Sequence, residues 1–351
     1  QADGSVVAAL PQRGASSVID GMRSAGRSRG RCIIRRMDID HRTEHSPRRQ
    51  LLLGGTGLAV ASAMSGLLRN AGAQAPAEPA AQGNGSKRTA VSRQPVLFIG
   101  HGSPMNAVAD NAFTQMLAGW GRALGKPRAI LMVSAHWLTE REVQVSTTAT
   151  PETIHDFGGF PPELYRLQYP APGAPAVAQR AAQALAPRVA GIDAQRGIDH
   201  GGWSVLRHMY PQADVPVFQL SIDITKAGTY HHAIGRALAS LRDEGVLIIG
   251  SGNIVHNLRA TMRDAPDSPR GLTPWAEEFD VRAKAALDAG DAPSLMAYET
   301  LTPGAMIAVP FPDHYFPLLY ALGAAQADEP ARHVYEGFQA GTLSMRCVQW
   351  G

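Results

Sequence analysis

Short apolar runs alternate with longer amphipathic stretches from Pro95 onward, and this alternation is typical of α/β domains. Four runs have the length of buried strands: Val96–Ile99, Ala129–Ser134, Val217–Ile222 and Val246–Ile249. They are continuous, as in strands that helices cover on both faces. Helical spacing predicts helices over Asn111–Leu124, Ala174–Ala186, Ala227–Arg242, Pro274–Ala289 and His314–Leu322, with a shorter one over Asp291–Thr300. We therefore expect a three-layer α/β/α fold around a central, mainly parallel sheet, with a mixed sheet left open.

The chain before this pattern reads as an export signal. Ser46 opens the segment Ser-Pro-Arg-Arg-Gln-Leu-Leu-Leu, an apolar stretch follows over Leu51–Leu68, and Ala73–Ala75 forms an A-x-A cleavage site. These parts, in this order, make up a twin-arginine signal peptide. Gly54 and Gly55 within the apolar stretch argue against a stable membrane span. The alternative is a disordered basic tail before an apolar helix. We expect a periplasmic protein, or a cytoplasmic one if the signal is not used.

Composition divides the chain into three segments. Residues 1–75 are the predicted leader, and residues 1–36 within it precede Met37 and are either disordered or upstream of the true translation start. Residues 76–94 are rich in Ala, Pro, Gly and Gln, which predicts a flexible linker. Residues 95–351 contain no linker-like break, so we predict a single catalytic domain there.

Charge is distributed unevenly between these segments. The 351 residues include 33 Lys and Arg against 30 Asp and Glu, for a net charge of +3. Residues 1–75 hold 11 of the basic and 5 of the acidic residues, which leaves 22 against 25 in the remainder. The body of the protein is thus mildly acidic, and nucleic acid is not an expected partner. The two cysteines, Cys32 and Cys347, are too few for a Cys-based zinc site.

Histidines follow three of the predicted strands. His101 comes directly after the first strand, His136 follows the second, and His256 lies just past the fourth. Because the carboxyl ends of parallel strands face one edge of the sheet, these three imidazoles can converge on a divalent metal. His200 lies in Asp-His-Gly-Gly-Trp, which we predict to be a loop whose glycines let the backbone approach a ligand. The alternative for any single histidine is a structural role.

Two further loops carry titratable and aromatic residues. His155 and Asp156 begin a Gly- and Pro-rich loop. The alternative is that this loop is an ordinary turn without a functional role. The segment Pro-Phe-Pro-Asp-His-Tyr precedes the last predicted helix, with Asp313 as a natural N-cap and His314 and Tyr315 left unexplained by capping.

Taken in order, these segments resemble the class III extradiol ring-cleavage dioxygenases, specifically the DOPA 4,5-dioxygenase branch. The resemblance is carried by Gly100–Met105, Ser134–Trp137, His155–Phe157, Asp199–Trp203, Val255–Leu258 and the segment that begins with His314-Tyr315. It covers about residues 95–351. Each motif is weak alone, but the ordered set is specific.

The resemblance implies a histidine-bound metal and a catecholic substrate such as L-DOPA, whose ring O2 opens to a muconic semialdehyde. It implies metal ligands at His101, His136 and His256, and either acid/base catalysis or a fourth ligand at His200. It further implies catalytic assistance or carboxylate binding by His155, and substrate binding by Ser103, Asp156, His314 and Tyr315. Better-known relatives use two histidines and a glutamate, so the metal preference stays open. Fe(II) is expected for activity, and Zn(II) fits the same ligands.

Two other classes remain as alternatives. A zinc hydrolase could use the same histidines, with His200 as the base. A chelatase-like metal-handling protein shares a strand followed by His-Gly-Ser, but such proteins lack the Ser-Ala-His-Trp and Asp-His-Gly-Gly-Trp segments. A homo-oligomer is also left open.

Overall fold

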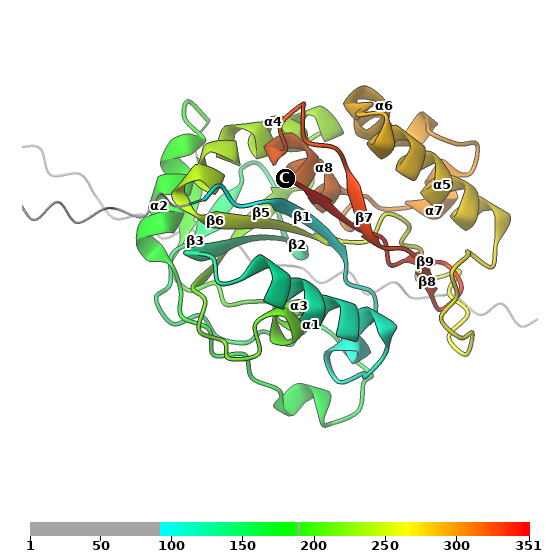
Figure 1. The fold of residues 1–351 in the computed structure, drawn as a ribbon, viewed down its shortest axis with the longest axis horizontal. Helices are drawn as coiled ribbons and strands as arrows, with labels where there is room; N and C mark the ends of the chain where they lie inside the picture. Colours follow the sequence, from blue (N-terminus) through cyan, green and yellow to red (C-terminus); the bar gives the residue numbers. More distant parts are fainter. Residues whose placement is uncertain (1–91, 189) are drawn as a thin grey trace, which may run out of the picture. The chain divides into compact units, whose positions relative to one another are not determined.

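An eight-stranded mixed sheet forms the centre of the protein in this computed structural model, which describes residues 92–188 and 190–351 (Figure 1). Its strands are β1 (Val96–Gly100), β2 (Ala129–Thr139), β3 (Gln144–Ser146), β4 (Gly191–Asp193), β5 (Val217–Asp223), β6 (Val246–Gly252), β7 (Arg332–Tyr335) and β10 (Cys347–Trp350). They lie in the order β4-β3-β5-β2-β6-β1-β10-β7. The predicted leader and nearly all of the predicted linker lie outside the described residues.

The four strands predicted from the sequence form the parallel centre of this sheet. β5, β2, β6 and β1 run parallel, whereas β3 joins β5 and β10 joins β1 in antiparallel pairs. Every residue of β1, β5 and β6 is buried, which explains their continuous apolar runs. The expected α/β fold around a mainly parallel sheet is thus confirmed, and the antiparallel strands at both edges make the sheet mixed.

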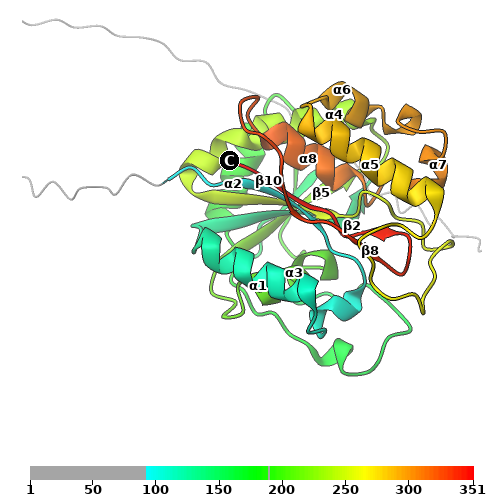
Figure 2. The ribbon, with the colours of Figure 1, turned by 45° about the vertical axis from the view of Figure 1, so that its right-hand side comes forward.

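Helices cover both faces of the sheet, as Figures 1 and 2 show. The α-helices are α1 (Ala112–Leu124), α2 (Pro175–Ala184), α3 (His200–Met209), α4 (Gly228–Leu238), α5 (Pro274–Asp288), α6 (Ala292–Met296), α7 (Ala305–Ala308) and α8 (Phe316–Ala324). The 3-10 helices are η1 (Pro104–Ala107), η2 (Leu164–Arg166), η3 (Ala239–Glu244) and η4 (Tyr298–Thr300). α1 and α3 lie together on one face, and α4 and α8 lie on the other. The described residues form one compact unit, and none of their helices is long and apolar enough to cross a membrane.

Alternation along β1 divides the interior into two hydrophobic cores. Val96 and Phe98 pack into the core that includes the α4 and α8 side chains, whereas Leu97 and Ile99 pack into the core that includes those of α1 and α3. Successive side chains of a strand point to opposite faces, so one buried strand serves both layers. The sheet is therefore covered on both sides, and its carboxyl edge is left for polar residues.

Helix α1 shows how local sequence sets an element's bounds. The Asn111 side chain accepts a hydrogen bond from the Thr114 N–H at 3.0 Å, and the Thr114 hydroxyl accepts one from the Asn111 N–H at 3.0 Å. This reciprocal pair is a capping box, which satisfies two donors at the start of the helix. Gly125 ends the helix at a φ of 70°, a backbone conformation that glycine adopts without strain.

Two elements differ from the prediction near the predicted metal ligands. His200 is the first residue of α3 and does not lie in a loop, because tertiary packing outweighs the poor helix propensity of Gly201 and Gly202. A Cβ on Gly201 would lie 2.4 Å from the Ser134 hydroxyl, so the glycine lets α3 approach β2 closely. β2 itself continues through His136, with an irregularity in its pairing after Val133.

A long loop between β6 and α5 is held against a small hairpin. The hairpin consists of β8 (Phe338–Gln339) and β9 (Leu343–Ser344). In the loop, the Met262 N–H donates to the Ala340 carbonyl at 2.9 Å, and the Leu272 N–H donates to the Gly341 carbonyl at 2.8 Å. The loop and the hairpin together form one side of the sheet's carboxyl edge.

Candidate functional site

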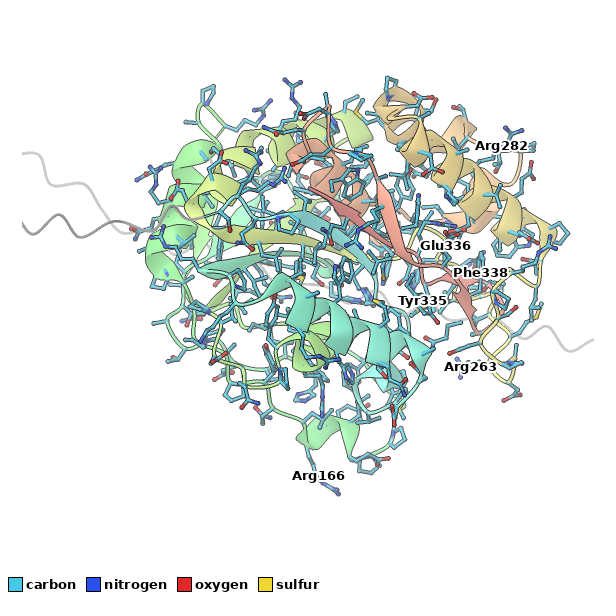
Figure 3. All side chains as sticks on the ribbon, in the orientation of Figure 1. Arg166, Arg263, Arg282, Tyr335, Glu336 and Phe338 are labelled. Atoms are coloured by element: carbon cyan, nitrogen blue, oxygen red, sulfur yellow. The ribbon has the colours of Figure 1, made fainter. Side chains whose placement is uncertain are left out.

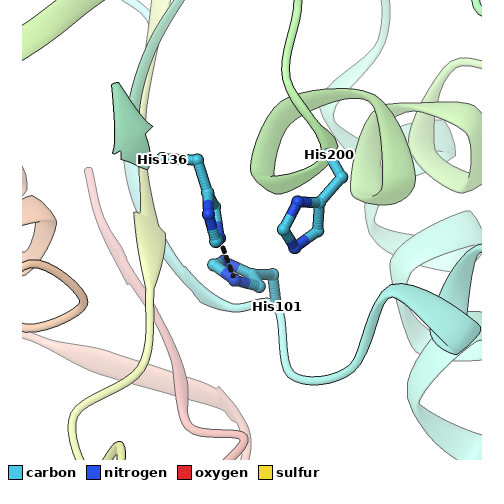
Figure 4. A group of neighbouring side chains, drawn as sticks. All are labelled: His101, His136 and His200. Atoms are coloured by element: carbon cyan, nitrogen blue, oxygen red, sulfur yellow. Dashed lines mark hydrogen bonds between the residues drawn. The ribbon is translucent and has the colours of Figure 1, made fainter. Parts of the chain in front are cut away.

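Three histidines from three elements meet at this edge, as Figure 4 shows. His101 directly follows β1, His136 lies in β2, and His200 begins α3. Each offers one nitrogen, and the three nitrogens lie within 4.8 Å of one another. The Nε2 atoms of His101 and His136 are 3.2 Å apart. The fold therefore brings together side chains that are up to 99 positions apart in the chain.

His314 and His256 extend this cluster on the side of α8. The His314 ring centroid lies 5.2 Å from that of His101 and 4.9 Å from that of His136. The His256 ring stacks on His314 with centroids 3.5 Å apart and planes 7° apart. The His314 carbonyl accepts a hydrogen bond from the Asn253 N–H at 2.9 Å, just after β6. A Cβ on Gly252 would lie 2.0 Å from that carbonyl, so a glycine is required for His314 to come this close.

The hydrogen-bond partners of His101 determine which of its ring nitrogens carries the proton. The Ser251 hydroxyl donates its one hydrogen to the Gly201 carbonyl at 2.6 Å, so its oxygen accepts from His101 Nδ1–H at 3.0 Å. The Nε2 atom of His101 then carries no proton, and its lone pair points at His136. This is the tautomer that a metal-ligating imidazole needs.

Asp156 orients the rings of two other histidines in a similar way. Its Oδ2 lies 3.2 Å from His136 Nδ1 and 3.0 Å from His200 Nδ1, and its Oδ1 accepts the His200 backbone N–H at 2.9 Å. The ring N–H of His200 does not point well enough at Asp156 Oδ2 to form a hydrogen bond, so that contact is electrostatic. A carboxylate beside Nδ1 favours the proton there and leaves Nε2 free.

The buried rings are held in their neutral form. Burial lowers the pKa of His136 to about 4 and that of His256 to about 4. Burial, together with the neighbouring histidines, lowers the pKa of His101 and His314 well below the usual range. Although burial alone would raise the pKa of Asp156, its contacts with His200 and His136 lower it to about 2. At neutral pH these four imidazoles are thus neutral and the Asp156 carboxylate is ionised, which is the state required for metal ligation.

The metal-free protein is therefore expected to lose stability in mild acid. An imidazole whose folded pKa is about 4 binds no proton near pH 5, whereas the same group in the unfolded chain, with a pKa of 6.5, does. The free energy of unfolding should thus be constant above about pH 6.5 and fall as pH drops toward 4, by about 1.4 kcal/mol per pH unit for each such group. Urea unfolding of chelator-treated protein between pH 7 and pH 4 measures this slope. A flat profile would show that these rings are not buried in their neutral form.

The nitrogens form two groups that could hold a metal. One consists of His101, His136 and His200, and the other of His256, Asp313 and His314. The donors of the first group fit a divalent metal because their Nδ1 atoms face Ser251 or Asp156, which leaves the Nε2 atoms available. His200 Nδ1 and His314 Nδ1 are buried and lack a hydrogen-bond partner among the described residues. The His256 ring, expected as a ligand beside His101 and His136, lies against His314, whose ring centroid is 4.9 Å from that of His136.

Replacing Asp156 with asparagine is expected to weaken metal binding by about 10- to 100-fold, the usual effect of losing a carboxylate behind a ligating histidine. The asparagine keeps the size of the side chain but removes the charge that orients two rings. Competition with a chromophoric chelator measures the metal affinity. Asp110→Asn, at a surface position, is the matched control and should leave the affinity unchanged. Equal affinities for both variants would show that Asp156 does not orient ligands.

A cavity of about 820 Å³ opens beside the histidine cluster. All five clustered histidines contribute to its wall, as do Ser103 and Asp156. Phe157 and Phe160 add aromatic rings that pack with centroids 5.4 Å apart. The volume lies within the usual range for small-molecule sites, and the wall combines aromatic rings with a few polar groups.

Two residues expected at the site lie outside this wall. Of the described residues predicted to act there, His155 and Tyr315 do not line the cavity. His155 Nε2 lies 3.0 Å from the Leu167 carbonyl, so it ties its own loop together. Tyr315 is 0% exposed and its hydroxyl donates to the Leu295 carbonyl at 3.0 Å, so its role is to pack the α8 side of the core.

Ser103 and Asp313 also differ in part from expectation. Ser103 lines the cavity, but its hydroxyl accepts the Met105 N–H at 3.2 Å and caps η1. Asp313, expected as the cap of the last helix, accepts the His314 N–H at 2.7 Å, while α8 begins three residues later at Phe316, with Tyr315 at the N-cap position. Its carboxylate also lies 3.0 Å from His314 Nδ1, so it orients that ring as Asp156 orients the others.

A buried hydrogen-bond network supports the cluster from behind, and no sequence pattern indicated it. The Asp199 carboxylate is 0% exposed and accepts from the Ser134 hydroxyl at 2.6 Å, from Arg196 at 2.7 Å and from Gln219 at 3.0 Å. The Ser134 hydroxyl in turn accepts the His136 N–H at 3.2 Å. Ser251, which orients His101, was also missed. Serine beside glycine at a strand's end was the available signal, but it is common in turns.

Comparison with known proteins shows relatives over the whole described domain. Residues 94–344 match the family model described as the catalytic LigB subunit of aromatic ring-opening dioxygenase. The chain is 48% identical over 267 residues to a 4,5-DOPA dioxygenase extradiol of Escherichia coli (strain K12), covering 74% of this chain and 96% of the relative. It is 41% identical to the protein of that name from Beta vulgaris, covering 70% and 92%.

A solved structure agrees with these sequence matches. The crystal structure of an uncharacterized protein from Escherichia coli K12 superposes with a TM-score of 0.64 at 42% identity, covering 74% of this chain and 100% of the other. The fold, the histidine cluster and the matched sequence thus agree. The chain belongs to the LigB family of aromatic ring-opening dioxygenases, as an extradiol enzyme.

Proposed function

We propose that the protein opens the aromatic ring of catechols such as L-DOPA with O2 at a histidine-bound divalent metal, to give a muconic semialdehyde. One observation carries this proposal: three imidazoles converge at the wall of a cavity that also contains aromatic rings. The names of the relatives support a DOPA-like substrate. The zinc hydrolase and chelatase readings have no comparable support.

His101 and His136 hold the metal in this proposal, because their Nε2 atoms face each other at 3.2 Å. The sequence predicts His256 as the third ligand, and two further rings flank the pair, His200 on the α3 side and His314 on the α8 side. Bound there, Fe(II) would supply coordination positions for the catechol oxygens and O2, together with the redox chemistry that Zn(II) lacks. Metal analysis of the alanine variants of His200, His256 and His314 identifies the third ligand, because its loss reduces the metal content most.

His256 and His200 are the candidate proton acceptors at the cavity wall. His256 is neutral at physiological pH because burial lowers its pKa to about 4, and it makes no side-chain hydrogen bond to the described residues. His200, the acid/base expected from the sequence, has Asp156 beside its Nδ1, which favours the proton there and leaves Nε2 free to accept one. A neutral imidazole at the wall takes a proton from a catechol hydroxyl and returns it later. Replacement of the acceptor, by His256→Gln or His200→Gln, should therefore lower kcat while metal remains bound, whereas replacement of a ligand should release the metal.

Phe157 gives the catechol ring an apolar surface to lie on. Its ring centroid is 5.4 Å from that of His200, so a substrate that lies against Phe157 also lies beside the metal-holding histidines. Holding the ring next to the reacting groups reduces the entropic cost of reaction.

Oxygen uptake tests the proposal directly. The full chain is stripped of metal, reloaded anaerobically with Fe(II), and mixed with L-DOPA in aerated buffer. O2 consumption with a yellow product is the expected result, and Zn(II) should not replace Fe(II). If substrate is converted without O2, a hydrolase is indicated. If no catechol leads to O2 uptake, the dioxygenase proposal is wrong.

Export through the twin-arginine pathway is also proposed for this protein, supported by the paired Arg48 and Arg49 before the apolar stretch. The segment lies outside the described residues. A fusion of residues 37–75 to a reporter that is active only in the periplasm should be exported, and Arg48→Lys with Arg49→Lys should block it. Reporter activity that persists in the double variant would contradict this pathway.

A further inference from the structure

Two charged side chains in the cavity wall are not used by the histidine cluster. Arg263 and Asp267 both lie in the loop between β6 and α5, both are exposed, and both line the cavity. Neither side chain makes a hydrogen bond or an ion pair with the described part of the chain. Their charges are therefore free to meet a ligand.

No other described residue of the wall offers the same two charges. Arg263 is the one wall side chain that is always cationic, since the other basic groups there are imidazoles. Asp156 is the second acid of the wall, but its oxygens contact His136 and His200. Arg263 and Asp267 thus form the available pair of opposite charges.

The loop holds this pair in place through its backbone. The Met262 N–H donates to the Ala340 carbonyl at 2.9 Å, directly before Arg263. Ser268, directly after Asp267, exchanges two backbone hydrogen bonds with Phe338, at 2.9 and 2.6 Å. Figure 3 shows Arg263 on the same side of the molecule as Phe338. Both charged residues therefore sit next to anchored backbone positions, which limits how far they can move away from the cavity.

We propose that Arg263 and Asp267 form a binding subsite for the head group of an α-amino acid: Arg263 for its carboxylate and Asp267 for its ammonium group. The inference rests on the proposed function, because the histidine cluster takes the diol end of the same molecule. A zwitterionic head group carries one positive and one negative charge on a single carbon, and the loop offers the complementary charges. Guanidinium–carboxylate contacts are also the stronger, often bidentate, kind of hydrogen bond. The protein therefore selects catechols that carry an amino-acid head group.

Four catechols that differ only in their charges test the subsite. L-DOPA carries both charges, 3-(3,4-dihydroxyphenyl)propionate only the carboxylate, dopamine only the ammonium group, and 4-methylcatechol neither. Arg263→Gln should raise KM about tenfold for the two carboxylates and leave KM for dopamine and 4-methylcatechol unchanged. Asp267→Asn should raise KM for L-DOPA and dopamine and spare the other two. Arg263→Lys should restore part of the lost affinity.

Matched controls come from the same loop. Arg259 and Asp264 are exposed but do not line the cavity. Arg259→Gln and Asp264→Asn should leave all four KM values unchanged. If either control shifts KM as much as its partner in the wall, the effect reflects general charge and the subsite is refuted. The subsite is also refuted if Arg263→Gln raises KM equally for all four catechols.

Binding of L-tyrosine provides a readout that does not depend on turnover. Tyrosine has the head group but lacks the second hydroxyl, so it should bind without being cleaved. Calorimetry should show about tenfold weaker binding to Arg263→Gln than to the unmodified protein. If no catechol is turned over, the proposed function fails, while tyrosine binding that depends on Arg263 still supports the subsite. If tyrosine binding is unaffected by both substitutions, the subsite fails alone.

Discussion

His136→Ala is expected to remove both the bound metal and the O2 uptake with L-DOPA. Its Nε2 lies 3.2 Å from that of His101, so alanine deletes one of the two imidazoles that face each other. Because loss of a second-layer partner already lowers metal affinity by about 10- to 100-fold, loss of a ligand should lower it by more than about 100-fold. Metal analysis after gel filtration and an oxygen electrode measure the two effects.

The matched control is His232→Ala, which removes a histidine of α4 that does not line the cavity. It should keep the metal and the activity. A His136→Ala protein that retains one metal per chain and full turnover would contradict the assignment of this ring. Circular dichroism of both variants checks that the fold persists.

Asp199→Ala is expected to lower the free energy of unfolding by about 3–5 kcal/mol, the usual cost of leaving one partner of a buried ion pair alone. Asp199 is 0% exposed and accepts from Ser134, Arg196 and Gln219. Alanine leaves the Arg196 guanidinium, which is 18% exposed, without its 2.7 Å partner. Urea unfolding of the metal-free protein at pH 7 measures the loss.

A surface pair provides the comparison. Asp243 accepts from Arg93 at 2.8 Å, but its side chain is 57% exposed, so Asp243→Ala should cost less than about 1 kcal/mol. Equal losses for the two variants would show that burial does not strengthen the Asp199 network. Because Ser134 joins that network to His136, the Asp199 variant should also bind metal more weakly.

Continuous apolar runs predicted the central strands well, because such a run can be recognised from neighbouring residues alone. β1, β5 and β6 match the runs at Val96, Val217 and Val246 to within three residues. The short antiparallel strands of the edges were missed, because β3, β7 and β10 contain polar residues and depend on pairing with distant partners. Helix α3 was missed because Gly201 and Gly202 lower its local propensity, whereas packing against β2 decides the outcome.

Placement at strand ends predicted His101 and His136 correctly as neighbours. It also predicted His256 as the third ligand, but it could not show that His200 and His314 lie close by, because the positions of these rings depend on how α3 and the segment before α8 pack on the sheet. The close contact at Gly252 brings His314 to the cluster, and no sequence pattern indicates that contact. Arg263 and Asp267 were missed for a similar reason, since their loop takes its position from a hairpin more than 70 residues further along the chain.

The position of β10 has a consequence for how a newly made chain matures. β10 (Cys347–Trp350) pairs with β1, so this early strand keeps an open edge on that side until residues 347–350 have been synthesised. The cluster likewise draws on His101 near the start of the described domain and His314 near its end. Ribosome-bound chains that stop before residue 314 should therefore lack both the complete sheet and the complete histidine cluster.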